Sequence, residues 1–110
     1  MFSNNINKDL PRGQAVPREE KGYSGELSTI GKLTYFTEYF EGITIEDKDI
    51  QSIIPIENPR ESKSFKEGYK RGMTLVEQGF TKENYHNFLT SLRTKPKKVV
   101  EEINKNKRHR

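Results

Sequence analysis

Basic side chains crowd the C-terminal end of this sequence, in a pattern suited to binding phosphate groups. Residues 93–110 contain eight lysines and arginines against two glutamates, although the net charge of the whole chain is only +4. A segment of this kind displaces counterions from phosphates and binds nucleic acid with little sequence preference and a strong dependence on salt. The alternative is a solvated end that only keeps the protein in solution. The side chains predicted to contact phosphate are Lys95, Lys97, Lys98, Lys105, Lys107, Arg108 and Arg110.

Two further groups of polar side chains fall on the predicted helices that precede this segment. Lys66, Lys70 and Arg71 would enlarge the positive surface if they lay beside the basic end. Lys82 and Asn87 lie on the next helix, after a short turn, which is also the arrangement of a helix-turn-helix. There a lysine would contact a phosphate or a guanine, and an asparagine an adenine edge. Both groups join the predicted nucleic-acid interface, although an ordinary αα-hairpin is the favoured interpretation of the turn.

The aromatic residues between positions 33 and 40 support a different function, which is binding to another protein. A chain in which 30% of the residues are hydrophobic and 33% are charged has a small core. Part of the aromatic surface is therefore expected to remain exposed and to mark a contact site. The partner-binding side chains predicted on this alternative are Tyr35, Phe36, Tyr39 and Phe40.

Gly68 and Gly72 place two glycines on one face of a predicted helix. A glycine inside a helix costs about 1 kcal/mol relative to alanine, so the pair indicates a close approach by another backbone. Residues 27–40 of the same chain are the favoured neighbour. The alternative is a groove for a partner protein or for a second copy of the chain.

Few residues have the types and spacing that catalysis or metal binding needs. The chain has no cysteine, and its two histidines, His86 and His109, have no partner at the spacing of metal ligands. The acidic group of Glu46, Asp47 and Asp49 lacks the glycine turn and final glutamate of a calcium loop, and is interpreted as a helix cap. We therefore expect no enzymatic activity, no cofactor and no metal site.

The strongest structural signal is a pair of helices in residues 64–92. Ser64 and Glu67 form a capping box that would start the first helix, and Gly79 suits the left-handed residue that would end it. Thr81 would cap the second helix. The apolar faces of the two helices are expected to pack against each other, and the domain is predicted to be built around this αα-hairpin.

Residues 24–42 have patterns that fit both a helix and a strand. Threonine, tyrosine and phenylalanine favour strands, so a short β-hairpin over residues 32–46 is the alternative. A helix is preferred because it would gather the aromatic side chains on one broad stripe, whereas a small protein could hardly cover both faces of such a strand. A short helix is expected within residues 44–54, where Pro55 prevents its continuation. The side chains expected to face inward are Ile45, Ile50, Ile53 and Ile54.

The sequence thus predicts a mainly α-helical protein with a single small domain at residues 25–104. Residues 1–24 are expected to form a mobile, disordered arm, and residues 105–110 a basic, frayed tail. Because neither an export signal nor a long apolar window is evident, the protein is predicted to be cytoplasmic and free of membrane spans. The leading hypothesis is a non-enzymatic, nucleic-acid-associated accessory or regulatory protein, and the alternative is an adaptor or inhibitor. A homo-oligomer is compatible with both, since it would enlarge a marginal core.

Overall fold

In the computed structural model, the described residues 22–108 form five α-helices and one short 3₁₀ turn, without any strand. The predicted mainly α-helical fold is therefore confirmed for this part of the chain. The elements are α1 (Ser24–Glu41), α2 (Asp47–Gln51), the 3₁₀ turn η2 (Pro59–Glu61), α3 (Lys63–Glu77), α4 (Lys82–Ser91) and α5 (Thr94–Arg108).

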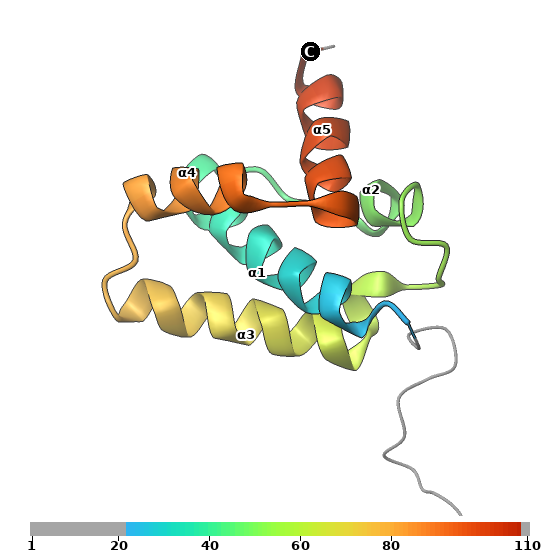
Figure 1. Ribbon diagram of the computed structural model, residues 1–110, viewed down its shortest axis with the longest axis horizontal. Helices are drawn as coiled ribbons and strands as arrows, with labels where there is room; N and C mark the ends of the chain where they lie inside the picture. The colour runs from blue at the N-terminus through green and yellow to red at the C-terminus, as the bar shows by residue number, and fades with distance from the viewer. Residues whose placement is uncertain (1–21, 109–110) are drawn as a thin grey trace, which may run out of the picture.

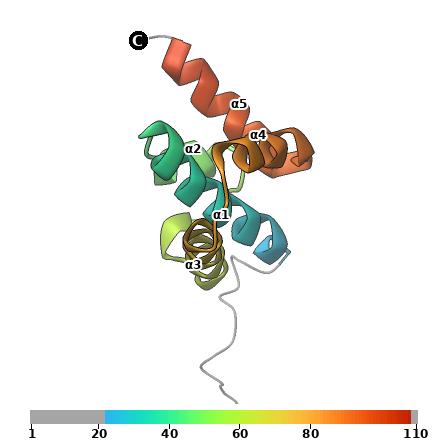
Figure 2. The ribbon, with the colours of Figure 1, turned by 90° about the vertical axis from the view of Figure 1, so that its left-hand side faces the viewer.

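Helix α1 lies at the centre of the molecule, with α3 on one side and α4 and α5 on the other (Figure 1, Figure 2). Its side chains Leu27, Ile30 and Leu33 are fully buried and share one core with apolar residues of α2, α3 and α5. The α3–α4 pair is therefore not the element around which the domain is built. Its two apolar faces pack on α1 from opposite sides instead of meeting each other, which corrects the sequence-based expectation.

Glycines allow α1 and α3 to cross with their backbones in contact. A Cβ added at Gly31 would lie 2.8 Å from the amide nitrogen of Tyr69, and one added at Gly68 would lie 2.7 Å from the carbonyl carbon of Ser28. Gly72 is less tightly enclosed, since its nearest neighbours would lie at 3.3 Å. The interpretation of the glycine pair as a crossing within the chain is confirmed. Gly31, which the sequence did not single out, is its counterpart on α1.

Residues 32–46 do not form a β-hairpin, so the preference for a helix is confirmed and the strand alternative is wrong. Helix α1 continues to Glu41, and Gly42 ends it in the left-handed conformation with φ of 69°. Neighbouring helices cover α1 on opposite sides, so its Thr34, Phe36 and Thr37 side chains are buried in spite of their local preference for strands. The buried Thr34 hydroxyl donates to the Ile30 carbonyl oxygen at 2.7 Å, which satisfies it within the helix.

Helix α3 begins two residues earlier than the sequence predicted. Its N-cap is Ser62, whose hydroxyl accepts a hydrogen bond from the Phe65 amide at 3.2 Å. Ser64 is buried inside the first turn of the helix, so the predicted capping box of Ser64 and Glu67 is wrong. The reason is that the η2 turn immediately precedes Ser62 and leaves it in the extended conformation of a cap.

The other predicted helix ends agree with the structure. Gly79 follows α3 with a positive φ of 105°, and the Thr81 hydroxyl caps α4 by accepting from the Asn84 amide at 3.1 Å. At the start of α2, the Glu46 amide donates to a carboxylate oxygen of Asp49 at 3.0 Å. The interpretation of this acidic group as a helix cap is therefore confirmed.

Isoleucines around α2 form the part of the core that receives α5. Ile45, Ile50 and Ile54 are fully buried, and they belong to the same cluster as Val99 and Ile103 of α5. The expected short helix is present, and three of the four isoleucines predicted to face inward are fully buried, whereas Ile53 is half-buried. This contact fixes the first half of α5 against α1 and α2.

Ordered structure extends slightly beyond both ends of the predicted domain at residues 25–104, and the division of the chain stays a prediction. Tyr23 packs against the core and α1 begins at Ser24. The rest of the predicted arm, residues 1–21, lies outside the described residues. Helix α5 continues through Arg108, where the sequence predicted a frayed tail from residue 105, and residues 109–110 lie outside the description.

Replacing Gly31 or Gly68 with alanine should destabilise the protein strongly, because the new methyl group would overlap the backbone of the facing helix. We expect the free energy of unfolding to fall by about 3 kcal/mol, the upper end of the cost of overpacking a core. Urea denaturation followed by circular dichroism measures this change. The control is Gly25→Ala, which lies on α1 like Gly31. Nothing lies within 4 Å of its added Cβ, so this substitution should stabilise the protein by up to about 1 kcal/mol. Equal stability of Gly25→Ala and Gly68→Ala would contradict the close crossing.

Candidate nucleic-acid interface and aromatic surface

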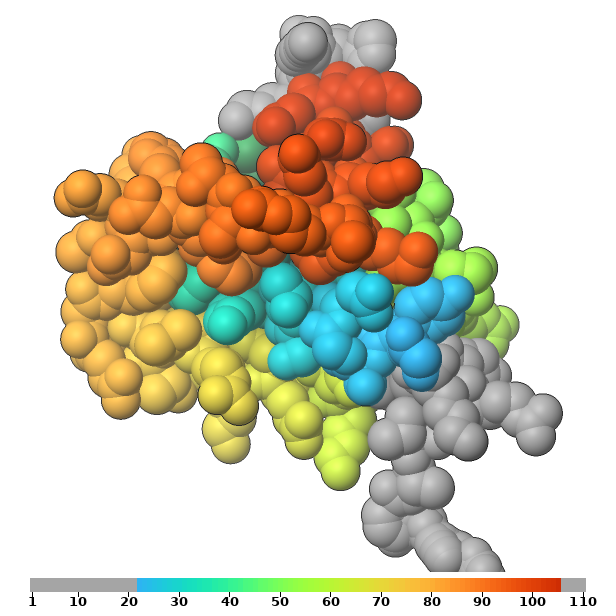
Figure 3. Space-filling model, in the orientation of Figure 1, coloured from blue at the N-terminus to red at the C-terminus, as the bar shows by residue number. Residues whose placement is uncertain are grey.

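Helix α5 packs its apolar face against the core, which leaves its basic face exposed to solvent. Val99 is fully buried and Ile103 is nearly so, whereas Lys97, Lys98 and Lys105 are exposed on the opposite side of the helix. The helix projects from the body between α4 and α2 (Figure 1, Figure 3). Three of the predicted phosphate-binding lysines are thus brought together on one surface, which we call the α5 lysine face (Lys97, Lys98 and Lys105).

The lysines of the α5 lysine face form no ion pair with another described residue. Glu101 is exposed on the same helix and reduces the local positive charge. Lys95 differs from them: it is half-buried, and its ammonium nitrogen lies 5.9 Å from the centre of the Tyr23 ring. Its contact with the tyrosine ring gives it a structural role at the start of α1.

The remaining basic residues predicted in the C-terminal segment are placed only in part. Lys107 and Arg108 belong to the last turn of α5, but their side chains lie outside the description, as does the whole of Arg110.

The basic residues of α3 are exposed, but they do not extend the α5 lysine face. Lys66, Lys70 and Arg71 lie on α3, and α1 separates that helix from α5 in both views (Figure 1, Figure 2). Lys82 and Asn87 are exposed on α4. Because α3 and α4 pack on opposite sides of α1, they do not form the compact crossing of a helix-turn-helix.

The four aromatic residues predicted to bind a partner have different environments. Phe36 is fully buried, and its ring stacks on Phe80 at 4.2 Å between ring centres. Phe40 is half-buried and stacks on Tyr85 at 5.3 Å. These two side chains join α1 to the α3–α4 turn and to α4, which makes them structural.

Among these four aromatic residues, Tyr39 is the one exposed to solvent, with 58% of its surface accessible. The half-buried Tyr35 links it to α3: the Tyr35 ring stacks on Tyr39 at 6.0 Å and meets the edge of Tyr69 at 5.2 Å. Gly68 and Gly72 are buried against α1, so the glycine face is occupied within the chain and is not open to a partner in this structure.

A polar anchor at Tyr85 holds α4 against α1. The Tyr85 ring is 2% exposed, and its hydroxyl donates to a carboxylate oxygen of Glu41 and lies 3.2 Å from the Thr37 hydroxyl. Burial raises the pKa of Tyr85 above its usual value of 10.0, and the hydrogen bond to Glu41 raises it further. The phenol is therefore kept protonated, as its role as a donor requires.

Neither a metal site nor a membrane span can be assigned within residues 22–108. No cluster of three histidine, cysteine, aspartate or glutamate side chains that could hold a metal ion occurs there. Among the same residues, no helix combines the length and the apolar character needed to cross a bilayer.

Comparison with protein-family models, with curated proteins and with solved structures finds no match for this chain. Any function must therefore be argued from its own surfaces.

Removing the Tyr85 hydroxyl should destabilise the protein at neutral pH but not at high pH. Because the pKa of Tyr85 is raised on folding, the proton contributes stability that is fully present below about pH 10 and is lost as the pH rises through the raised pKa. Tyr85→Phe should lower the free energy of unfolding by about 1–3 kcal/mol at pH 7, since the partner carboxylate loses its donor. The difference between Tyr85→Phe and the parent protein should shrink above about pH 10 in urea denaturation. A difference that stays constant up to about pH 11, roughly one unit above the usual pKa of a tyrosine, would contradict the anchor.

Phe36 and Tyr39 should respond oppositely to truncation, although they are three positions apart on one helix. Phe36→Ala should lower the free energy of unfolding by about 3–5 kcal/mol, because it empties a buried aromatic site. Tyr39→Ala should change it by less than about 0.5 kcal/mol, because most of its ring is already in contact with water. Thermal unfolding of both variants measures the contrast, and a strongly destabilised Tyr39→Ala would show that this ring is part of the core.

Proposed function

We propose that this protein is a non-enzymatic, nucleic-acid-associated accessory or regulatory protein that binds phosphates through the α5 lysine face. The observation that carries the proposal is the exposure of three lysines on one side of a projecting helix, without an ion pair to any described residue. Lysines in that state are free to replace the counterions of a phosphate backbone. A cytoplasmic location would be consistent with this role.

Contacts of this type position a protein on nucleic acid without reading its sequence. Affinity should therefore be similar for different sequences and should fall steeply with salt. Each lysine that meets a phosphate contributes about 0.9 to the slope of log K against log salt concentration on duplex DNA, and about 0.7 on a single strand. Lys107 and Arg108 follow on the same helix and would add to this slope.

Neutralising the α5 lysine face should weaken binding and flatten its salt dependence. The test variant is K97Q/K98Q/K105Q, and the matched control is K66Q/K70Q/R71Q, which removes the same charge from α3 on the other side of α1. Fluorescence anisotropy with labelled random-sequence duplex DNA and single-stranded RNA, over a range of salt concentrations, gives the slopes. We expect the α5 variant to reduce the magnitude of the salt slope on duplex DNA by about 2.7, which is about 0.9 for each of three lysines. The α3 variant should leave this slope nearly unchanged.

Two results would overturn this proposal. Unchanged binding by K97Q/K98Q/K105Q would show that the α5 lysine face does not meet phosphates. An equal loss in the α3 variant would show that only the overall charge matters and that no specific surface exists.

The second candidate is a protein-interaction adaptor or inhibitor, and the exposed ring of Tyr39 is the observation that favours it. A tyrosine in this setting offers a large contact area at a low cost in side-chain entropy. Tyr35 would support it from below through their stacking contact. Tyr39→Ala should leave the fold intact. If this variant fails to bind a partner that the parent protein binds, the loss can be attributed to the missing Tyr39 ring.

A further inference from the structure

A second surface with its own chemistry lies on α3, away from the α5 lysine face. A shallow depression of about 250 Å³ opens between the end of η2 and the first three turns of α3. We call it the α3 depression, and its lining residues are Arg60, Phe65, Lys66, Tyr69, Lys70 and Met73.

The floor of the α3 depression is aromatic and held in place by polar contacts. The Tyr69 hydroxyl donates to Glu38 at 2.7 Å, and the Arg60 guanidinium donates to the same carboxylate at 3.3 Å. The guanidinium also lies 5.4 Å from the centre of the Phe65 ring and 5.9 Å from that of Tyr69. The charge of Arg60 is therefore balanced from within the protein, and the floor needs no ligand to neutralise it.

The rim of the α3 depression carries positive charge that an acidic ligand could meet. Lys66 and Lys70 are exposed and lie one helical turn apart, which places their Cβ atoms about 6 Å from each other. No carboxylate is among the residues that line the depression. Lys66 pairs with Glu61 at 3.3 Å, but both side chains are more than half exposed, so the pair is weak and a ligand could replace it.

Met73 completes the α3 depression with an apolar wall. It is 37% exposed. Methionine is flexible and polarisable, which suits contact with an apolar side chain of variable shape.

We propose that the α3 depression binds a short acidic segment of another protein, in which two carboxylates flank one large apolar side chain. The carboxylates pair with Lys66 and Lys70, and the apolar side chain packs on Tyr69 and against Met73. An apolar anchor in a pocket with charged pairs at its edge is the usual division between affinity and specificity at a small interface. This role is independent of nucleic-acid binding by α5, because the two surfaces share no residue.

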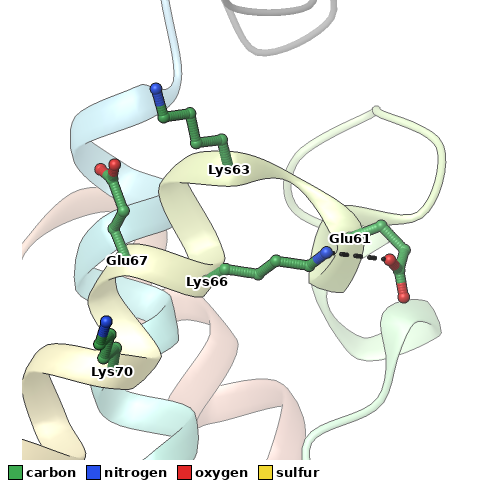
Figure 4. A pocket seen from close by; sticks show the side chains of 5 residues that line it. All are labelled: Glu61, Lys63, Lys66, Glu67 and Lys70. Atoms are coloured by element: carbon green, nitrogen blue, oxygen red, sulfur yellow. Dashed lines mark ion pairs between the residues drawn. The ribbon is translucent and has the colours of Figure 1, made fainter.

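The neighbouring charges favour an acidic peptide over nucleic acid at this site. Next to the α3 depression lies a more open one of about 450 Å³, lined by Glu61, Lys63, Lys66, Glu67 and Lys70. Figure 4 shows the two glutamates among the three lysines along α3 and η2. A phosphate backbone that followed α3 would meet these carboxylates, whereas a short segment needs only the two lysines of the rim.

The test uses the full chain and a fluorescent peptide. The probe is an alanine-based helical peptide of about 15 residues, with two glutamates four positions apart and a leucine between them. Two control peptides replace the leucine by alanine or both glutamates by lysine. The protein variants are K66E/K70E and, with the same change in net charge, K97E/K98E, and thermal unfolding first verifies that both retain the fold.

We expect the probe to bind the parent protein and K66E/K70E to weaken it by about tenfold, because attraction becomes repulsion at two positions. K97E/K98E should weaken it by less than about threefold, since charge at that distance is screened by salt. The alanine control peptide should bind about tenfold more weakly, as expected for the loss of one buried leucine side chain, and the lysine peptide should not bind.

Three outcomes would overturn the proposal: no binding of the probe to the parent protein, an equal loss in K97E/K98E, or unchanged binding of the alanine control peptide. A single-stranded oligonucleotide measured in parallel separates the two surfaces. If K66E/K70E loses the oligonucleotide and K97E/K98E retains it, α3 is the nucleic-acid surface and the roles proposed for both helices are wrong. If only K97E/K98E loses it, the role of α5 stands, whatever the peptide result.

Discussion

The close crossing of α1 and α3 is the constraint on which the rest of the structure depends. With Gly31 and Gly68 facing the opposite backbone, the two helices approach to a distance that any larger side chain would prevent. This contact buries Gly31 of α1 against α3, and Gly68 and Gly72 of α3 against α1. The other sides of α1 are then left for the aromatic contacts with α4 and for the isoleucine cluster that receives α5. One helix thereby serves as the core contact for the whole domain.

Two polar anchors on α1 fix the helices that the apolar core alone would leave free to slide. Glu38 accepts hydrogen bonds from Arg60 and Tyr69, which secures the entry into α3. Glu41 accepts one from Tyr85, which secures α4. Both carboxylates lie near the end of α1, so its last turn determines how the two flanking helices are placed. Hydrogen bonds from buried or half-buried donors to carboxylates are stronger than those between neutral groups, which suits this positioning role.

A central helix also keeps the two charged surfaces of this protein apart. The α5 lysine face and the α3 depression belong to helices that α1 separates (Figure 2), and they differ in character. The α5 surface has lysines without described partners, which suits the spread charge of a phosphate backbone. The α3 surface has an aromatic floor, an apolar wall and only two available lysines, which suits a small ligand with defined geometry. The basic side chains of one sequence thus serve two different kinds of recognition in our proposals.

The sequence by itself determined the helical class, the turn at Gly79 and Thr81, the acidic cap of α2 and the inward-facing isoleucines, because each depends on residues only a few positions apart. Only the tertiary structure decided that α1 is a helix along its whole length, that α3 and α4 pack on it from opposite sides, and that Phe36 is core while Tyr39 is surface. It also separated Lys66 and Lys70 from α5 and brought Glu38 to Arg60. These outcomes depend on which helix covers which face, and coverage is set by contacts between residues far apart in the chain, for which local spacing carries no signal.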